Sequence, residues 1–220
     1  MFPRPTWFKN TCLNFAENLL FPSPEIENPD TSIAIIEASE HGVQQRITWT
    51  ELRNRVAQFA AALRAAGVTK GDRVGGTCLG YTWLIIGFLA NTSHAVVAFL
   101  ATASIGALWS CTSPDFGASS VLDRLSQIEP KILLADNAVL YNGREHDTLA
   151  KLAVVAAGIK TLEKVVVFPN VKSHSMDVSA IPHGFVLLLS ILTVGSPHMT
   201  FYQSPMLPLN SLPSHSIIPS

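Results

Sequence analysis

Two short segments of this chain carry side chains that could bind a ligand. One is Tyr141–Arg144 (Y-N-G-R), in which a glycine precedes an arginine, and the other is the loop Ser113–Gly117 (S-P-D-F-G). Arg144 can pair with a phosphate through two parallel hydrogen bonds, and Gly143 lets the backbone approach a ligand closely. The loop follows a predicted strand, and ligands of open α/β sheets bind at the carboxyl ends of the strands. Both segments are therefore candidates for ligand binding.

Each segment also has a purely structural interpretation. Arg144 lies near Glu145 and Asp147, so it can equally be a solvated residue at the start of a helix. Pro114 and Asp115 are turn-forming residues, which explain the loop without any ligand. The sequence leaves these alternatives open.

The composition excludes several classes of function. The chain has 220 residues, 48% of them apolar and 14% charged, with a formal net charge of −1. This charge creates no field that would steer nucleic acid or an anionic membrane. The histidines show no metal-ligand spacing, so no metal site is expected, and we interpret His94 and His146 as structural or surface residues. Cys12, Cys78 and Cys111 are odd in number and far apart, which favours a reducing compartment.

Strands alternate with helices along most of the chain. The expected strands cover 32–37, 46–49, 107–112, 131–135 and 164–168, with another that starts at Val74. Helices are expected over 13–20, between Thr48 and Gly67, over 92–105, up to Ile128 and over 145–157. This alternation predicts βαβ units and an α/β fold whose parallel sheet is covered on both faces.

The ends of two helices carry recognisable signals. Thr48 and Glu51 have the spacing of a capping box, and Gly67 is expected to end the same helix in a left-handed conformation. Ser119 or Ser120 is expected to cap the helix that follows the S-P-D-F-G loop. In the helix between Thr48 and Gly67, apolar residues recur at steps of three and four. They form its predicted core face, which consists of Leu52, Val56, Phe59, Ala60 and Leu63.

Two segments break the alternating pattern. The apolar stretch 77–87 separates a strand from its helix, and we interpret it as an insert. The segment 173–220 holds one charged residue, Asp177, with six prolines and ten serines, and is expected to be disordered or collapsed. No charged residue lies between Arg73 and Asp115, so membrane attachment through 74–108 is a further alternative, although its most apolar run is marginal in length for a span. No signal peptide is expected, because prolines stand where its apolar core should be.

A set of phrases between Trp7 and Val171 carries a family resemblance. They read L-N-F-A-E-N-L-L, G-D-R-V, N-T-S-H-A-V, S-P-D-F-G, V-L-D-R-L-S-Q-I-E-P-K and Y-N-G-R-E-H. With these phrases the chain resembles the acetoacetyl-CoA synthetases, which are acyl-adenylate-forming ligases. The resemblance implies that residues 1–172 are a fragment of the AMP-binding N-terminal domain, with a partial doubly wound parallel sheet. The segment 173–220 would then be a disordered tail foreign to the family.

The family joins acetoacetate to coenzyme A (CoA) in two half-reactions, for ketone-body use and lipid synthesis in the cytosol. ATP and acetoacetate give an acyl-adenylate and pyrophosphate, and CoA then attacks the acyl-adenylate to give the thioester. The first step needs Mg²⁺ and a Gly/Ser/Thr-rich loop that ends in lysine and cradles the phosphates. The sequence has no such loop, since its nearest candidates, 75–77 and 115–120, lack the lysine. We therefore assign no catalytic residue and expect the chain to be inactive alone.

The resemblance assigns a CoA role to a few residues. Relatives contact the CoA nucleotide through an Arg-Gly-Arg-type phrase, which corresponds here to Tyr141, Asn142, Gly143 and Arg144. Phe116 could support the pantetheine or the adenine of CoA. Besides a truncated ligase, the sequence leaves open a non-catalytic fragment that associates with itself or with the full-length enzyme through an exposed sheet edge.

Overall fold

Helices and strands alternate through the described part of the chain, as the sequence predicts. The computed structural model describes residues 12–21, 30–40, 42–76, 89–111, 117–188 and 200–203. Its helices are α1 (Phe15–Leu20), α2 (Trp49–Ala65), α3 (Ser93–Ile105), α4 (Ala118–Ile128) and α5 (Leu149–Gly158). Its strands are β1 (Ile33–Ser39), β2 (Gly42–Thr48), β3 (Arg73–Gly76), β4 (Leu108–Cys111), β5 (Ile132–Asp136), β6 (Ala138–Tyr141), β7 (Arg144–Asp147), β8 (Lys164–Phe168), β9 (Gly184–Leu188) and β10 (Thr200–Gln203).

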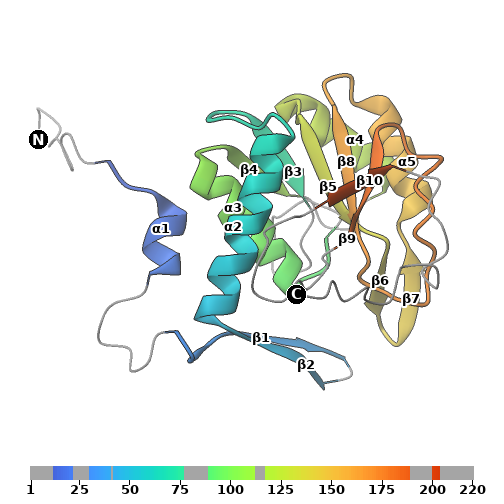
Figure 1. Ribbon diagram of the computed structural model, residues 1–220. Helices are drawn as coiled ribbons and strands as arrows, with labels where there is room; N and C mark the ends of the chain where they lie inside the picture. Colours follow the sequence, from blue (N-terminus) through green and yellow to red (C-terminus); the bar gives the residue numbers. More distant parts are fainter. Residues whose placement is uncertain are drawn as a thin grey trace, which may run out of the picture.

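Six of these strands form one sheet, in the order β10-β9-β8-β5-β3-β4. The strands from β9 to β4 are parallel to their neighbours, and β10 is antiparallel to β9. The chain passes from β3 to β4 on one side and then returns to β5 on the other, so the winding reverses between β3 and β5. The predicted partial doubly wound parallel sheet is confirmed, and Figure 1 shows helices on both of its faces.

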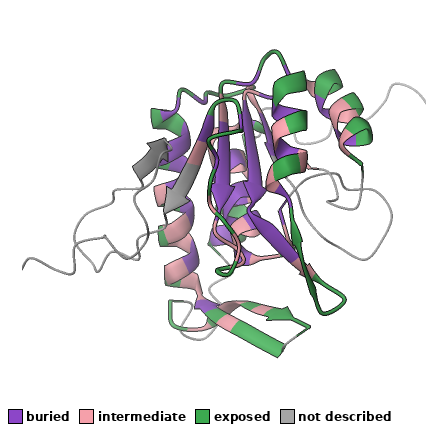
Figure 2. Cartoon of the chain, turned by 90° about the vertical axis from the view of Figure 1, so that its right-hand side faces the viewer, coloured by how far each residue is buried: buried purple, intermediate pink, exposed green. Residues whose placement is uncertain are grey.

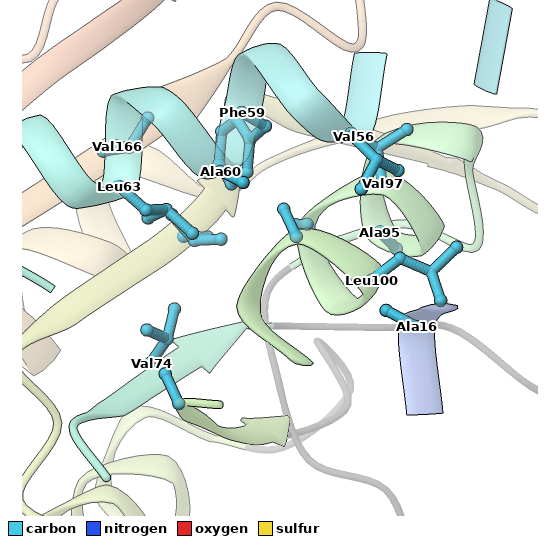
Figure 3. Packing of buried hydrophobic residues seen from close by; sticks show 14 of the residues in the cluster. Ala16, Val56, Phe59, Ala60, Leu63, Val74, Ala95, Val97, Leu100 and Val166 are labelled. Atoms are coloured by element: carbon cyan, nitrogen blue, oxygen red, sulfur yellow. The ribbon is translucent and has the colours of Figure 1, made fainter. Parts of the chain in front are cut away.

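The two faces of the sheet carry separate apolar clusters, because successive side chains of a strand point to opposite sides. In β5, Ile132 and Leu134 belong to the cluster under α1, α2 and α3, whereas Leu133 and Ala135 belong to the cluster under α4 and α5. All five residues of β5 are buried, as the apolar run predicts (Figure 2). Figure 3 shows the first cluster, in which side chains of α2 and α3 lie over the sheet.

Most sequence signals of the long helix α2 are confirmed, although the carboxylate of Glu51, expected to complete the capping box, pairs with Arg55 one turn later. The hydroxyl of Thr48 accepts a hydrogen bond from the amide of Glu51 at 3.2 Å, and the predicted core face of this helix is buried. Gly67 follows the helix with φ +86°, in the left-handed region as expected. Local sequence and tertiary packing therefore agree along this element.

The helix predicted over 145–157 is wrong in its first part. The residues from Ala138 to Asp147 form the antiparallel hairpin β6–β7, and the helix begins only at Leu149. Asn142 and Gly143 have φ values of +51° and +66°, which is the conformation that asparagine and glycine favour in a two-residue hairpin turn. The Asn-Gly pair is the signal that outweighs the helical periodicity of the residues after it.

The predicted cap of α4 is also wrong. The helix begins at Ala118, with Gly117 as the capping residue, and no side chain of the described ranges caps it. Ser119 and Ser120 lie inside the first turn instead, one and two residues after the start. Their hydroxyls are therefore too far along the chain to serve as the helix cap.

The residues 173–188 belong to the fold, in contrast to the disorder predicted from 173 onward. Val178 and Ile181 are buried in the cluster under α4 and α5, and β9 pairs in parallel with β8. A few buried residues and the pairing with β8 thus give this segment a defined place in the fold, although most of its described side chains are not buried. The insert predicted at 77–87 and the last part of the tail lie outside the described residues.

The stretch 74–108, for which membrane attachment was the alternative, is described only over 74–76 and 89–108. These residues form the short strand β3, the buried helix α3 and the strand β4. Among all described helices, none combines the length and apolar character needed to cross a bilayer.

Candidate functional site

The residues predicted to bind CoA lie together at the tip of one hairpin. Tyr141 ends β6, Asn142 and Gly143 form the turn, and Arg144 begins β7. All four residues are exposed. Phe116, the other predicted contact, lies outside the described residues.

The backbone of this turn already holds an anionic group. The amides of Asn142 and Gly143 donate to the two carboxylate oxygens of Glu40, at 2.6 Å and 2.7 Å. Consecutive amides that converge in this way form an anion-binding concavity. The turn therefore has the geometry for an anion, independently of the Arg144 side chain.

Glu40 comes from a second hairpin, which lies beside the first. It follows β1, and β1 and β2 form a two-stranded antiparallel sheet separate from the large one. The tips of the two hairpins approach each other below the main sheet (Figures 1 and 2). The anion site is thus shared between segments about a hundred residues apart in the sequence.

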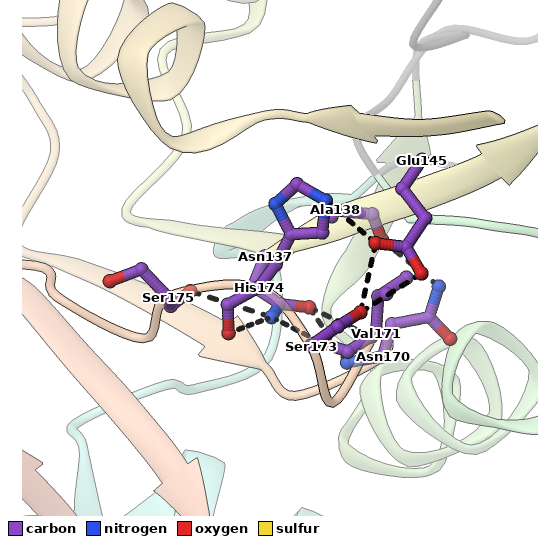
Figure 4. A network of polar contacts seen from close by, with 8 residues as sticks. All are labelled: Asn137, Ala138, Glu145, Asn170, Val171, Ser173, His174 and Ser175. Carbon is purple, nitrogen blue, oxygen red and sulfur yellow. Dashed lines mark hydrogen bonds and ion pairs between the residues drawn. The ribbon is translucent and has the colours of Figure 1, made fainter.

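A buried asparagine fixes the base of the hairpin to the segment after β8. Asn137 accepts hydrogen bonds from the amides of Asn170 and Val171, at 2.9 Å and 3.0 Å, and donates to the carbonyl of Val171 at 2.8 Å. Figure 4 shows these contacts converging on a side chain with no exposed surface. Because both ends of the amide are used, the position of β6 relative to the sheet is well determined.

The second strand of the hairpin is tied to the same segment by a carboxylate. Glu145 accepts hydrogen bonds from the hydroxyl of Ser173 at 2.8 and 2.9 Å and lies 3.1 Å from Nε2 of His174 (Figure 4). The hairpin therefore cannot rotate freely about its base. The anion-binding turn is carried on a supported element.

A second polar site, which sequence reasoning missed, lies at the carboxyl end of β5. Asp136 is completely buried, and its Oδ2 accepts a hydrogen bond from the amide of Ala90 at 2.5 Å. No described residue donates to Oδ1. Burial raises the pKa of Asp136 well above its ordinary value, the charge of Glu37 raises it further, and the amide of Ala90 opposes this only in part. The signal in the sequence was an aspartate at the end of a wholly apolar strand.

The start of α3 lies between Asp136 and another carboxylate. Glu37 accepts hydrogen bonds from the amide of Ser93 at 2.9 Å and from Gln45 at 2.7 Å. Burial raises the pKa of Glu37, but these hydrogen bonds and the nearby His94 lower it overall. The two carboxylates therefore hold the chain where it enters α3, next to the reversal of winding between β3 and β5.

His94 lies near Glu37 at the start of α3, and its pKa is lowered. Its ring stacks on that of Phe168 with centroids 5.1 Å apart, and its Nδ1 has no hydrogen-bond partner among the described residues. Burial lowers its pKa, Arg55 lowers it further, and the charge of Glu37 opposes both. We interpreted His94 from the sequence as structural or surface, and its stacked, half-buried ring fits the structural role.

Within the described residues, no three histidine, cysteine, aspartate or glutamate side chains are grouped to coordinate a cation. What the arrangement can do is bind an anion at the Asn142–Gly143 turn and hydrogen-bond a polar group near Asp136. Neither feature supplies a nucleophile for covalent chemistry.

Comparisons with known proteins point to one family. Residues 26–181 match the family model described as AMP-binding enzyme. The chain is 45% identical over 215 residues to an acetoacetyl-CoA synthetase of Macaca fascicularis. This match covers 97% of this chain and 29% of that protein. It is 44% identical over 182 residues to a malonamoyl-CoA synthetase of Penicillium aethiopicum, covering 83% of this chain and 24% of the relative.

A solved structure gives the same result for the fold. The acetoacetyl-CoA synthetase from Streptomyces lividans superposes with a TM-score of 0.67 at 35% sequence identity. The match covers 86% of this chain and 26% of the other. The chain therefore spans less than a third of the length of the relatives it matches.

Proposed function

This chain belongs to the AMP-binding enzyme family, and on that basis we propose that it is the first part of an acetoacetate–CoA ligase. In the complete reaction ATP activates acetoacetate as an acyl-adenylate, and CoA then takes the acyl group to form acetoacetyl-CoA. The share of this chain in that reaction is to bind CoA at the tip of the β6–β7 hairpin. Such an enzyme would act in the cytosol, in ketone-body use and lipid synthesis.

One observation carries the CoA assignment. Two backbone amides of the turn converge on an anionic group, at 2.6 and 2.7 Å, and an exposed arginine follows them directly. CoA carries phosphates on its nucleotide, and converging amides beside an arginine are a common way to bind them. The acyl group is a separate question. Relatives named for acetoacetate and for malonamate match this chain at nearly equal identity, whereas CoA is common to both names.

The residues present do not fit ATP and Mg²⁺. The sequence contains no Gly/Ser/Thr-rich loop that ends in lysine, and the described residues contain no group of three histidine, cysteine, aspartate or glutamate side chains placed to hold a metal ion. No step of adenylate formation can therefore be assigned to this chain. We expect the purified chain to show no acetoacetate-dependent exchange of pyrophosphate into ATP. Exchange above a sample without acetoacetate would overturn this part of the proposal.

Arg144→Ala tests the CoA assignment. Charge-assisted hydrogen bonds contribute about 1.5–3 kcal/mol, so the substitution should weaken CoA binding by roughly ten- to a hundredfold. The measurement is calorimetric titration of the purified chain with CoA. Arg64→Ala, which removes an exposed arginine near the end of α2, is the matched control and should leave the affinity unchanged. Equal losses in the two variants, or no CoA binding by the wild type, would contradict the assignment.

A further inference from the structure

We propose that the carboxylate of Glu40 is an internal competitor, which fills the anion site of the Asn142–Gly143 turn until a phosphate-bearing ligand displaces it. The inference rests on the proposed function only for the identity of that ligand. The competition itself follows from the contacts between the two hairpins. It concerns how the site is regulated rather than what the site binds.

The contacts show that one anion fills the turn. Both carboxylate oxygens of Glu40 are engaged, one by the amide of Asn142 and one by the amide of Gly143. A phosphate presents pairs of oxygens in a comparable way, so it can use the same two donors. Each amide has one hydrogen, and the two groups are both negative, so the turn cannot hold them together.

The turn keeps its shape when the occupant changes. The left-handed conformations of Asn142 and Gly143 are those that the hairpin itself requires, and Asn137 and Glu145 hold the base of the hairpin. The two donors are thus fixed by β6 and β7 and not by Glu40. Removal of the Glu40 carboxylate should leave a formed and vacant anion site.

When Glu40 is displaced, the movement takes place in the β1–β2 hairpin, whose end carries this residue. β1 and β2 form a sheet of only two strands, and Glu40 lies at its exposed end. Both hairpins are two-stranded, and the body of β1–β2 is held by Ile47 in the core and by the contact of Glu37 with the amide of Ser93. Glu40 lies beyond these contacts and is exposed, so its displacement requires a movement of the hairpin tip only and leaves the core in place.

The experiment follows the backbone amides of Asn142 and Gly143 by nuclear magnetic resonance while inorganic phosphate is added at constant pH. Glu40→Ala removes the competitor, and Glu40→Gln keeps its size but not its charge. We expect the phosphate concentration at half-saturation to fall by about tenfold in Glu40→Ala and by less in Glu40→Gln. Glu17→Ala, on α1, removes one exposed carboxylate elsewhere and should behave as the wild type.

The outcomes separate this inference from the CoA assignment. If phosphate moves neither amide in any protein, or moves both at equal concentrations in the wild type and the Glu40 variants, the internal competitor is refuted. If CoA binding depends on Arg144 but Glu40→Ala leaves it unchanged, the competitor is likewise refuted while the CoA assignment stands. If phosphate binds more tightly to the Glu40 variants but CoA does not bind, the competitor stands and the CoA assignment falls. Unshifted amide signals from the core of each variant show that it is folded.

Discussion

Asp136 is an acid whose surroundings favour its neutral form. It has no exposed surface, it ends the buried strand β5, and only its Oδ2 has a hydrogen-bond donor among the described residues. Burial raises its pKa well above the ordinary value, so between the pKa of the unfolded chain and that of the folded chain the folded state keeps a proton that the unfolded state has lost. Wherever the folded state binds more protons, the free energy of unfolding falls as the pH rises.

Asp136→Asn removes this titration and keeps an oxygen for the amide of Ala90. The variant should gain stability relative to the wild type as the pH rises from 5 to 8, at up to about 1.4 kcal/mol per pH unit. The lowered pKa values of Glu37 and His94 have their own pH dependence, but it is common to both proteins and largely cancels in the difference. Urea unfolding at pH 5, 6, 7 and 8 measures that difference.

Asp123→Asn, an exposed substitution on α4, is the control for this prediction. It should give no trend with pH beyond that of the wild type. A difference between Asp136→Asn and the wild type that stays constant from pH 5 to 8 would show that Asp136 is ionised in the folded chain.

At the scale of elements, β9 depends on one glycine for its approach to the preceding turn. A Cβ atom at Gly184 would lie 2.9 Å from the carbonyl oxygen of Val178 and 3.0 Å from that of Ile181. Both oxygens are backbone atoms of a packed turn, so they cannot move aside cheaply. Gly184 therefore lets β9 lie beside β8 while Val178 and Ile181 stay buried.

Gly184→Ala should destabilise the chain by about 1–3 kcal/mol, the usual cost of overpacking a closely packed site. Gly117→Ala is the control for the loss of a glycine without overpacking, because Gly117 has an ordinary φ of −60° and its Cβ would meet nothing nearer than 4.0 Å. Its expected cost is only that of alanine in place of glycine at the N-cap of α4. Unfolding in urea compares the two variants with the wild type. If the two substitutions cost the same, β9 does not pack as described.

The sequence predicted elements well where the local pattern and the tertiary environment agree. The strands β5 and β8 are examples, because burial on both faces leaves a continuous apolar run. The capped helix α2 is another, because burial of one face leaves apolar residues at helical spacing. The hairpin β6–β7 was missed because only Ala138 and Val139 of its strands are buried, so it shows no apolar alternation, and its signal is confined to Asn142 and Gly143. The segment 173–188 was missed because its contacts with Asn137 and β8 come from distant parts of the chain.

The candidate site could be predicted only in part for the same reason. The turn residues follow from the family resemblance, and the structure shows them together at one tip. Glu40, the partner of the turn amides, could not be predicted in this way, because nothing in the sequence near it indicates that it meets a turn about a hundred residues later. Pairings between separate hairpins are set by the whole fold and leave no local trace.

At the scale of the whole molecule, α1 and its flanks expose a group of large apolar side chains. Four of them lie between 45% and 74% exposed, and they are Leu13, Phe15, Leu19 and Phe21. The strand β4, which lies at one edge of the sheet, also exposes Leu108 at 57%. Apolar side chains gathered in this way favour association, which is the alternative that the sequence left open for a chain that binds to itself or to the full-length enzyme.

Leu13→Glu combined with Leu19→Glu should weaken this self-association at least about tenfold, since each leucine loses about 1.5–3 kcal/mol of burial in the contact. Sedimentation velocity over a range of protein concentrations measures the effect. Val154→Glu is the matched control, because Val154 is similarly exposed but lies on α5, on the other side of the sheet (Figure 1). A wild-type chain that stays monomeric at all concentrations, or an equal effect of the control, would contradict the prediction.

The strand order has a consequence for synthesis on the ribosome. β5 lies between β3, which is made before it, and β8, which is made about 30 residues later. At the usual rate of translation, a few seconds pass in which the buried strand β5 has a partner on one side only. Until Phe168 has left the ribosome, the nascent chain therefore offers an apolar strand edge to molecular chaperones. A pause in translation after β5 has emerged from the ribosome and before β8 has emerged should lengthen that exposure and lower the yield of folded protein.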